Sequence, residues 1–548
     1  MSQPIRLFPF GGVGEFGKNM MVYAIGDEAI IVDCGMGFPG TGQYGIDVVI
    51  PDISALTEFG FNLRGLVLTH GHEDHIGAIP YLIRKLDVPM YASPITIALI
   101  KAKLDEAKIR WDIHPLPETG KIDVGPFGIE AIPVTHSIMD AMSIAIHTPY
   151  GAIIHTGDFK FDPSPVDGRA TALHRFSALG DQGVLLLASD STNATRSGSS
   201  PSERSVAHGL RQTVSECKGK VVVTTFASNM FRIQQIIDAA VQCGRKVIFA
   251  GRSIERHVQI ANQFNRLNIP DGLVHTMSDL KHLEDHEVLM IATGSQGEFR
   301  AALARIAQGH MKGFKLKEGD LVVFSSSVIP GNEAVISALC NHIYRRGARI
   351  VHAGHVHLHV SGHAQAHELK TMMQLTRPRF FYPVHGEYRF LVEHQYLAQA
   401  TGIPAQNTII AENGQSVEVD ADEIRLGQTF HSGAVFVDSS DEIDYPVLRD
   451  RRKLAEDGMV NAVVMISEHE GTLLGQPEIE AFGVLHTSLS QDILKQATDD
   501  LTHYLTGLSP EMMSDATNMR EEVRVWLRRW FKRQIHRRPV VLAVILEI

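Results

Sequence analysis

Four potential metal ligands lie within six residues of each other: His70, His72, Asp74 and His75. The mostly apolar run 63–68 precedes them and predicts a buried strand. Neutral imidazoles and carboxylates are the groups that bind zinc, and two histidines at alternate positions after a strand can reach one ion. The segment therefore predicts a metal site at the end of a strand.

The two remaining side chains, Asp74 and His75, indicate a second ion. With a single ion they would be spare, whereas a second ion about 3.5–4 Å from the first would take them as its first two ligands. The alternative is a His-rich surface loop. Such loops do not usually place His-x-His-x-Asp-His between a buried strand and a helix, so the metal hypothesis is favoured.

Three later strand ends carry further ligand types. His136 follows a predicted strand at 129–134, Asp158 follows one at 152–155, and His385 follows the apolar run 380–384. A carboxylate can bridge two cations, which makes Asp158 the natural shared ligand, and His385 would complete the second ion. Asp33, at the end of a predicted strand at 28–32, is a candidate to orient the histidine loop by hydrogen bonding.

The intervening segments predict the elements that position these residues. Strands are predicted at 20–25, 28–32, 88–92, 129–134, 143–147 and 152–155, and helices at 75–86 and 96–109. Strands followed by helices on both faces, with ligands on the loops at strand ends, indicate an αββα sandwich.

A βα repeat begins near residue 200. Ser200, Pro201 and Glu203 predict a capped helix start. Strands are predicted at 221–225, 246–250, 288–292 and 321–325, and helices at 229–241 and 332–345. This rhythm predicts a parallel, doubly wound insert of about 150 residues.

Five regions are predicted along the chain. They are the first part of the sandwich core (1–188), the insert (189–348), the second part of the core (349–425), a linker (426–450) and a small C-terminal α/β domain (451–548). The linker is predicted because 419–445 is largely polar. The last domain is predicted from strands at 459–466 and 540–548 and helices at 489–505 and 517–537.

The helix predicted at 517–537 is strongly basic and also carries Trp526 and Trp530, four positions apart. Its basic residues are Arg520, Arg524, Arg528, Arg529, Lys532, Arg533 and Arg537, and Arg538 follows. Such a face could contact RNA or a protein partner. A solvated basic face above a packed Trp stripe is more common and is favoured.

Composition restricts the class of protein. The 548 residues are 44% hydrophobic and 21% charged, which is typical of a globular chain with several domains. No apolar run approaches the roughly 20 residues that cross a bilayer, and the first residues do not resemble a signal peptide. We expect a cytoplasmic protein without a membrane partner. The net charge of -11 argues against a generally basic nucleic-acid binder, although divalent ions would reverse the local field.

The glycine-rich segment 9–19 contains two misleading patterns. Gly12, Gly14 and Gly17 match a dinucleotide fingerprint, but the residues that follow alternate like a hairpin rather than a helix. The segment also matches most of a phosphate loop, but Asn19 stands where Ser or Thr should follow Lys18. A tight glycine turn between strands is favoured.

The ligand motifs resemble those of the metallo-β-lactamase superfamily: the loop at 70–75, His136 and Asp158, with Asp33 similar to its first motif. Asp190, His363 and His385 are similar to motifs A, B and C of the β-CASP branch, whose members cut nucleic acids. A histidine at motif C goes with RNA-processing members of that branch. Segments 11–19, 189–193, 226–229, 359–364 and 383–388 extend the resemblance to the bacterial ribonuclease J family, almost end to end. Met139 departs from the proline that is usual in the family, which affects local loop geometry.

The resemblance implies hydrolysis of RNA phosphodiesters with two zinc ions, with manganese or magnesium as possible replacements. One ion would be held by His70, His72, His136 and Asp158, and the other by Asp74, His75, Asp158 and His385. Zinc lowers the pKa of bound water to about 7, which would supply the nucleophile. Besides Asp74, the implied catalytic residues are His363, which would protonate or hydrogen-bond the leaving oxygen, and Asp190, which would orient it or a metal ligand.

The resemblance further implies 5′→3′ exonuclease activity on single-stranded RNA with a 5′-monophosphate, together with endonuclease activity, in RNA processing and decay. The implied phosphate pocket uses Ser228, Asn229, His359, Ser361 and Gly362. His355, His357 and His359 alternate, so one face of an extended segment would carry three imidazoles. The implied assembly is a homodimer or homotetramer, with possible RNA-decay partners.

Two other functions compete with a ribonuclease. A small-molecule metallohydrolase would need no large insert over the cleft. A non-catalytic RNA-binding or scaffold subunit would be expected to lose metal ligands, whereas all seven candidates are present here. Both alternatives are therefore less favoured.

Overall fold

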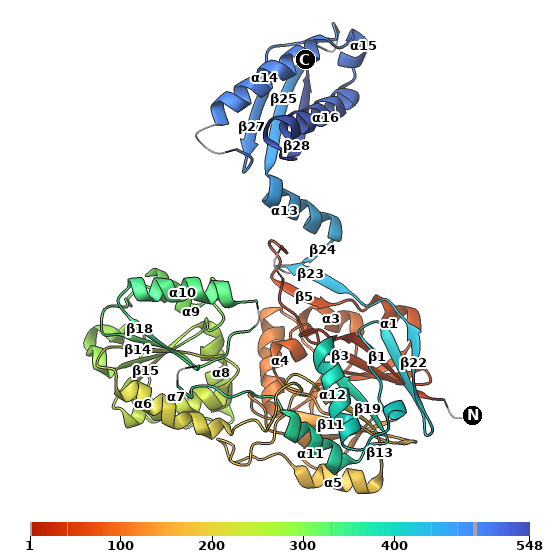
Figure 1. Cartoon of the computed structure of the whole chain (residues 1–548), viewed down its shortest axis with the longest axis vertical. Coiled ribbons are helices and arrows are strands. Elements are labelled where there is room, and N and C mark those ends of the chain that lie inside the picture. The colour runs from red at the N-terminus through yellow and green to blue at the C-terminus, as the bar shows by residue number, and fades with distance from the viewer. Residues whose placement is uncertain are drawn as a thin grey trace. The chain divides into compact units, whose positions relative to one another are not determined.

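The computed structural model describes residues 3–40, 42–329, 331–354, 356–439, 441–467, 469–485 and 490–548. Two units form: one contains 1–37 and 50–434, and the other contains 38–49 and 435–548. Figure 1 shows the elements of both units along the chain. Among the described residues, no helix combines the length and the hydropathy needed to cross a membrane.

Two mixed sheets form the core of the first unit (Figure 1). In strand order, the eight-stranded sheet contains β22 (Ile424–Thr429), β21 (Gln415–Val419), β1 (Ile5–Gly11), β3 (Met20–Ile25), β4 (Glu28–Val32), β6 (Asn62–Val67), β7 (Met90–Ala92) and β8 (Ile113–Pro115). The six-stranded sheet contains β19 (Phe380–Val384), β13 (Val184–Asp190), β12 (Gly151–His155), β11 (Met142–Thr148), β10 (Phe127–Pro133) and β9 (Ile122–Val124). Side chains from both sheets form one buried cluster, which includes Ile30, Ile144 and Tyr382.

Helices complete the layers on both sides of these sheets. Those of the core are α1 (Ser54–Phe59), α2 (Glu73–Ile76), α3 (Ile79–Leu86), α4 (Pro94–Glu106), α5 (Leu173–Gln182), α11 (Ala366–Thr376) and α12 (Tyr388–Ala400). Phe176 of α5 and Met372 of α11 pack with Ile154 of β12 in a second buried cluster. The predicted αββα sandwich is confirmed. The helix predicted at 75–86 is divided into α2 and α3.

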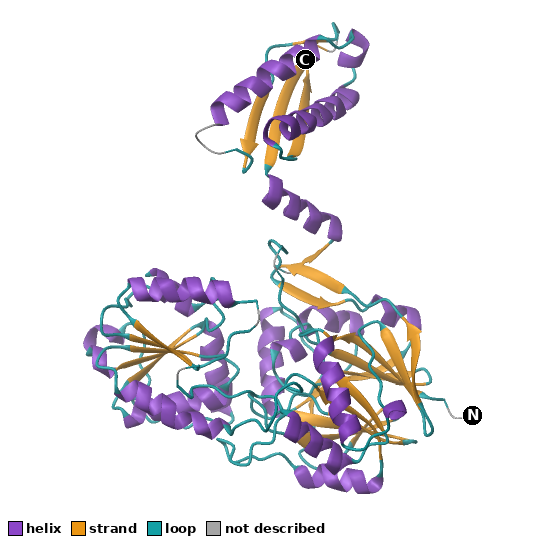
Figure 2. Ribbon diagram, viewed as in Figure 1, coloured by secondary structure: helices purple, strands orange, loops and turns teal. Residues whose placement is uncertain are grey.

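The insert has a parallel five-stranded sheet with helices on both faces, as Figure 2 shows. In strand order it contains β15 (Lys246–Ala250), β16 (Val288–Ala292), β14 (Val221–Thr224), β17 (Leu321–Phe324) and β18 (Arg349–His352). Its helices are α6 (Val206–Ser215), α7 (Met230–Gln242), α8 (Arg252–Gln263), α9 (Ala302–Gln308) and α10 (Glu333–Arg345). The doubly wound prediction is confirmed. Strand β18, which lies in the range predicted for the second part of the core, pairs with β17.

The capped helix start predicted at Ser200 is wrong. The first helical turn there is a short 3-10 segment, Glu203–Ser205, and Ser202 caps it. Glu203 turns inward because its carboxylate pairs with the fully buried guanidinium of Arg232 at 2.7 Å. The hydroxyl of Ser200 donates instead to the carbonyl of His363 at 2.5 Å.

The second unit has its own sheet and core. Its strands are β25 (Met459–Ser467), β26 (Thr472–Leu473), β27 (Glu478–Phe482) and β28 (Val540–Glu547), and its helices are α13 (Tyr445–Asp457), α14 (Ser490–Thr506), α15 (Pro510–Met513) and α16 (Ala516–Ile535). Leu489, at the predicted start of α14, lies outside the described residues. On α16 the rings of Trp526 and Trp530 stack with centroids 6.4 Å apart, as predicted. Most of its basic side chains, including Arg528 and Arg533, are exposed.

The structure differs from the predicted linker at 426–450. Strand β22 continues the core sheet, β23 (Ala434–Asp438) pairs with β24 (Asp441–Ile443), and α13 begins at Tyr445. Composition concealed these elements because edge and surface strands bury few apolar side chains.

Candidate metal centre

The loops after β6, β10 and β12 bring three imidazoles and one carboxylate together. The Nδ1 atom of His72 lies 3.1 Å from His70 Nε2 and 3.1 Å from His136 Nε2. Asp158 Oδ2 lies 3.6 Å from His70 Nε2 and 3.5 Å from His136 Nε2. Each of the four side chains offers one donor atom, and these atoms lie within 4.8 Å of one another.

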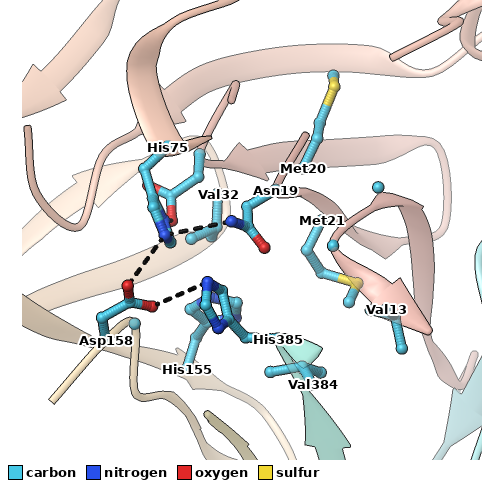
Figure 3. Close-up of a pocket in the computed structure, with 14 residues that line it drawn as sticks. Val13, Asn19, Met20, Met21, Val32, His75, His155, Asp158, Val384 and His385 are labelled. Atoms are coloured by element: carbon cyan, nitrogen blue, oxygen red, sulfur yellow. Dashed lines mark hydrogen bonds and ion pairs between the residues drawn. The ribbon is translucent and has the colours of Figure 1, made fainter. Parts of the chain in front are cut away.

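A second group of ligand types adjoins the first. It contains Asp74, His75, Asp158 and His385, whose donor atoms also lie within 4.8 Å of one another. His75 Nε2 is 3.3 Å from Asp158 Oδ2, and His385 Nε2 is 3.4 Å from Asp158 Oδ1. Figure 3 shows Asp158 between these two rings, with one carboxylate oxygen toward each. The predicted shared position of Asp158 therefore matches the geometry.

Two atoms of this centre are buried without a hydrogen-bond partner: Asp158 Oδ1 and His385 Nε2. Leaving a buried polar atom unpaired costs about 1–3 kcal/mol, so a native site normally supplies a partner. A divalent cation satisfies both atoms at once, and imidazole nitrogens with carboxylate oxygens are ligands that such cations accept. The residues present therefore fit a metal centre.

Neighbouring groups orient His75 and His136 through one ring nitrogen, so that the other nitrogen points toward the centre. His75 Nδ1 donates to Asp33 Oδ2 at 2.7 Å, and Asp33 also accepts from the backbone N–H of Thr69 at 2.8 Å. These contacts are the ones expected for Asp33. His136 Nδ1 donates to the carbonyl of Gly362 at 2.7 Å. In each case the second ring nitrogen faces Asp158, at 3.3 Å for His75 and 3.5 Å for His136, which is the orientation a metal-binding histidine needs.

Burial and charge act in opposite directions on these rings. Burial lowers the pKa of His72 to about 4 and that of His70 and His136 well below the ordinary value, so all three are neutral near pH 7. Burial also disfavours a charged His75 or His385, but Asp158 and other nearby carboxylates outweigh it and raise both pKa values well above the ordinary range. The centre therefore attracts positive charge, which a divalent ion can supply in place of protons.

Asp190 and His363 lie beside the second group. His363 Nδ1 donates to Asp190 Oδ2 at 2.8 Å, and the ring of His363 stacks on that of His385 with centroids 5.5 Å apart. Thr192 donates its hydroxyl proton to Asp190 Oδ1 at 2.7 Å and accepts from His385 Nδ1 at 2.8 Å. Asp190 thus fixes His363 directly and His385 through Thr192.

The residues predicted for the phosphate pocket have different surroundings. Asn229 caps α7, where its side chain accepts from the backbone N–H of Arg232 at 2.9 Å. Ser361 Oγ accepts from Asn193 Nδ2 at 2.8 Å. Gly362 packs on His136, where an added Cβ would lie 2.9 Å from the ring. Ser228, in the turn before α7, is half-buried.

Burial alternates along the segment predicted to be extended: Leu358 and Val360 are buried, whereas His357 and His359 are not. Residues 353–354 and 356–362 contain no strand, and His355 lies outside the described residues. His357 Nε2 contacts Ser205 Oγ at 2.7 Å, whereas His359 Nε2 contacts Ser327 Oγ at 3.3 Å. The two imidazoles therefore have separate partners, although both lie opposite the buried Leu358 and Val360.

Several residues at the centre were not predicted to take part. Asn19, considered only as a mismatch to a phosphate loop, donates from Nδ2 to the Asp74 carbonyl at 2.9 Å and lies 3.2 Å from His75 Nε2. Behind the ligands, Tyr23 and His155 share a hydrogen bond of 2.9 Å. Asn19 and His155 both line a cavity of about 20 Å³ next to Asp158, which Figure 3 shows. No local pattern distinguishes these residues, since only the folded chain brings them to the site.

Comparisons with known families match nearly the whole chain. The matching models are the metallo-beta-lactamase superfamily over residues 13–198, the ribonuclease J beta-CASP domain over 218–343, the Zn-dependent metallo-hydrolase RNA specificity domain over 349–408 and the ribonuclease J C-terminal domain over 446–548.

Curated relatives match over almost the full length of this chain. Ribonuclease J of Helicobacter pylori is 36% identical over 544 residues, which cover 98% of this chain and 79% of that protein. Ribonuclease J of Synechocystis sp. is 37% identical over 559 residues, which cover 99% of this chain and 87% of that protein. Ribonuclease J 1 of Streptococcus pyogenes is 38% identical over 547 residues, which cover 99% of this chain and 97% of that protein.

Solved structures include chains that are similar in fold. A protein of unknown function from Enterococcus faecalis aligns with a TM-score of 0.54 and 16% identity, over 76% of this chain and 100% of that one. At this identity the likeness concerns the arrangement of elements alone.

Proposed function

The chain belongs to the ribonuclease J family of metal-dependent ribonucleases, and from that premise we propose that it hydrolyses RNA with two zinc ions held by the two ligand groups that share Asp158. The observation that carries the proposal is the convergence of seven ligand side chains, in which two buried atoms, Asp158 Oδ1 and His385 Nε2, make no hydrogen bond. Bound zinc ions would activate water for attack and neutralise charge on the phosphate.

The protein's own groups would place the substrate and move the proton. His363 is fixed through Nδ1 by Asp190, which leaves Nε2 as the atom that donates a proton to the leaving oxygen. Asp33 and the Gly362 carbonyl hold His75 and His136 in fixed tautomers, so the ligand atoms need no rearrangement when a metal binds.

The direct test is cleavage of RNA labelled at its 3′ end, before and after chelation and metal add-back. Substrates carry a 5′-monophosphate or a 5′-triphosphate, and matched single-stranded DNA is the control. We expect metal-dependent release of mononucleotides from the monophosphate RNA, internal cuts as a minor product, and little cleavage of DNA. Absence of any cleavage by protein with metal bound would refute the proposal in favour of a scaffold role.

The preference for a 5′-monophosphate would come from a pocket near His359. Its Nδ1 is buried without a hydrogen-bond partner. Burial, and then the positive charges of Arg232, Lys160 and Arg196, lower the pKa of His359 to about 3, so a neutral imidazole lies in the field of these cations, of which Arg232 is paired with Glu203. An anionic phosphate is well suited to such surroundings, and Ser228 and Ser361 would add hydroxyl contacts.

The pocket is tested by exchanging His359 for Ala, with His357→Ala as the matched control, because His357 is exposed and bonded to Ser205. We expect His359→Ala to remove most of the preference for monophosphate over triphosphate ends, while His357→Ala keeps it. An unchanged preference in His359→Ala would show that the phosphate binds elsewhere.

The second unit is proposed to support assembly into a homodimer or homotetramer. Alternate residues of β28, Val541 and Ala543, are buried, whereas Leu542 and Leu546 on the opposite face are 54% and 44% exposed. Exposed apolar sheet faces of this kind are typical of protein interfaces. Light scattering at micromolar concentration should give at least the mass of a dimer, and a Leu542→Asp variant should dissociate. A wild-type monomer would contradict the proposal.

A further inference from the structure

An exposed aromatic side chain, that of Phe16, lies beside the metal centre, and the exposed Tyr388 follows His385 by three residues. Phe16 is 44% exposed and Tyr388 is 50% exposed. The ring of Phe16 contacts the candidate ligand His385, with centroids 6.2 Å apart, and the ring of Phe390, with centroids 5.9 Å apart. None of these aromatic rings has a role in the proposed hydrolysis.

The backbone holds Phe16 in this position from several sides. Strand β2 (Val13–Gly14) pairs with β20 (Gly386–Glu387), which links the glycine loop to the residues after His385. Asn413 Oδ1 accepts from the backbone N–H of Val13 at 3.1 Å, and Asn413 Nδ2 donates to Glu15 at 2.7 Å. Gly17 turns with φ +82°, close to Gly37. The ring therefore extends from a fixed loop rather than from a free one.

A cation lies next to these rings. The guanidinium of Arg389 sits over Phe390, 4.5 Å from its centroid, and the side chain is 65% exposed. Arg389 also bonds to Glu387 at 2.8 Å, which fixes its plane and offsets its charge. Exposed aromatic faces combined with an arginine plane are the groups on which unpaired nucleobases stack.

We propose that Phe16 and Phe390, with Tyr388 and Arg389 at their margin, form a platform that stacks an unpaired base of the RNA next to the phosphate being cut. The inference rests on the proposed function, since it assumes that RNA is cut at this centre. Every base has a stacking face, so the platform raises affinity without selecting a sequence. A base inside a duplex has both faces covered, so the platform also favours single strands at the cut.

The test combines variants of the protein with abasic RNA. Phe16→Ala, Phe16→Leu and Phe16→Trp are compared on single-stranded 5′-monophosphate RNA, and an abasic residue is scanned along the 5′ end. Stacking of one base changes affinity by about 5-fold to 100-fold. We expect Phe16→Ala and Phe16→Leu to raise KM for intact RNA by that factor with little change in kcat, and Phe16→Trp to retain the wild-type KM.

The abasic substrates separate stacking from a structural role. At the stacked position, loss of the base should raise KM for wild type but not raise it further for Phe16→Ala, because both changes remove the same contact. Independent effects, or a Phe16→Leu variant equal to wild type, would overturn the platform. If Phe16→Ala fails to fold, the difference in KM between Phe16→Leu and Phe16→Trp decides whether the ring stacks on a base. Failure of the proposed function is distinct, since the wild type itself would then leave RNA uncut with metal bound.

Discussion

At the scale of residues, the charge of the ligand set determines what the centre can bind. It contains five imidazoles, which are neutral as metal ligands, and two carboxylates, Asp74 and Asp158. Two divalent ions would therefore leave an excess of positive charge facing the substrate, in a chain whose formal net charge is -11. A phosphodiester is attracted locally even though the whole molecule would repel it.

Exchange of His75 for Ala should lower kcat/KM on RNA by more than about 100-fold, because loss of a ligand exceeds the 10-fold to 100-fold effect of altering a supporting contact. Circular dichroism should remain close to wild type. His114→Ala is the matched control, since His114 is an exposed histidine bonded to Asp112 at 2.8 Å. An active His75→Ala variant would remove His75 from the ligand set.

The candidate ligands could be predicted from sequence because each follows a recognisable strand. His70, His136 and His385 are placed by apolar runs that determine where strands end. Asn19 and Thr192 could not be predicted, because their importance arises only from contacts with Asp74 and Asp190. Gly362 was predicted to bind substrate, but its contact with His136 depends on segments more than 200 positions apart.

At the scale of elements, one arginine of the insert joins the two core loops that follow His136 and Asp158. Arg266, just after α8, contacts Asp140 and Asp167, each at 2.6 Å. Asp140 follows His136, and Asp167 follows Asp158, so both ligand-bearing loops are fixed to the insert. The three side chains are at most 13% exposed, so these ion pairs are weakly screened.

Arg266→Ala should therefore lower the free energy of unfolding by about 3 kcal/mol, since it leaves Asp167 without its cation, and Asp140 with only the exposed Arg169 at 3.6 Å, at a largely buried position. It should also weaken metal retention during dialysis against chelator. Arg256→Ala is the control, because Arg256 pairs with Glu106, which is 61% exposed, and should change stability by less than about 1 kcal/mol. Equal effects of the two substitutions would contradict the role assigned to Arg266.

Periodicity predicted the elements that have strong apolar patterns. It failed where contacts with distant residues determine where an element begins. The strands at 20–25 and 28–32 match β3 and β4, and the four predicted insert strands match within one residue. The cap at Ser200 was wrong because Glu203 pairs with Arg232 from a distant helix. The strands at 424–438 were missed because they bury few apolar side chains: Ile424 and Val437 are buried, whereas Leu426 is 51% exposed.

At the scale of the whole molecule, all seven candidate ligands belong to the unit formed by residues 1–37 and 50–434. The second unit has its own buried core, which includes Val464, Leu527 and Trp530. A bound ion stabilises only the structure that forms its site. The two units should therefore respond differently to metal.

Zinc in about 1,000-fold excess over its dissociation constant should stabilise the first unit by about 4 kcal/mol. Hydrogen exchange measured with zinc and with chelator should show slower exchange in β6, β12 and β19 when zinc is present. Exchange in β25 and β28 should be the same in both conditions. A metal centre confined to the first unit would be contradicted if zinc slowed exchange equally in all five strands, or slowed it in none of them.

The spacing of the proposed ligands also has a consequence during translation. His70 emerges from the ribosome early, but His385 follows only after the whole insert has been made. At about 5–20 residues per second, tens of seconds separate the two. Until translation has passed the insert, the nascent chain therefore lacks one of the four candidate ligands of the second group.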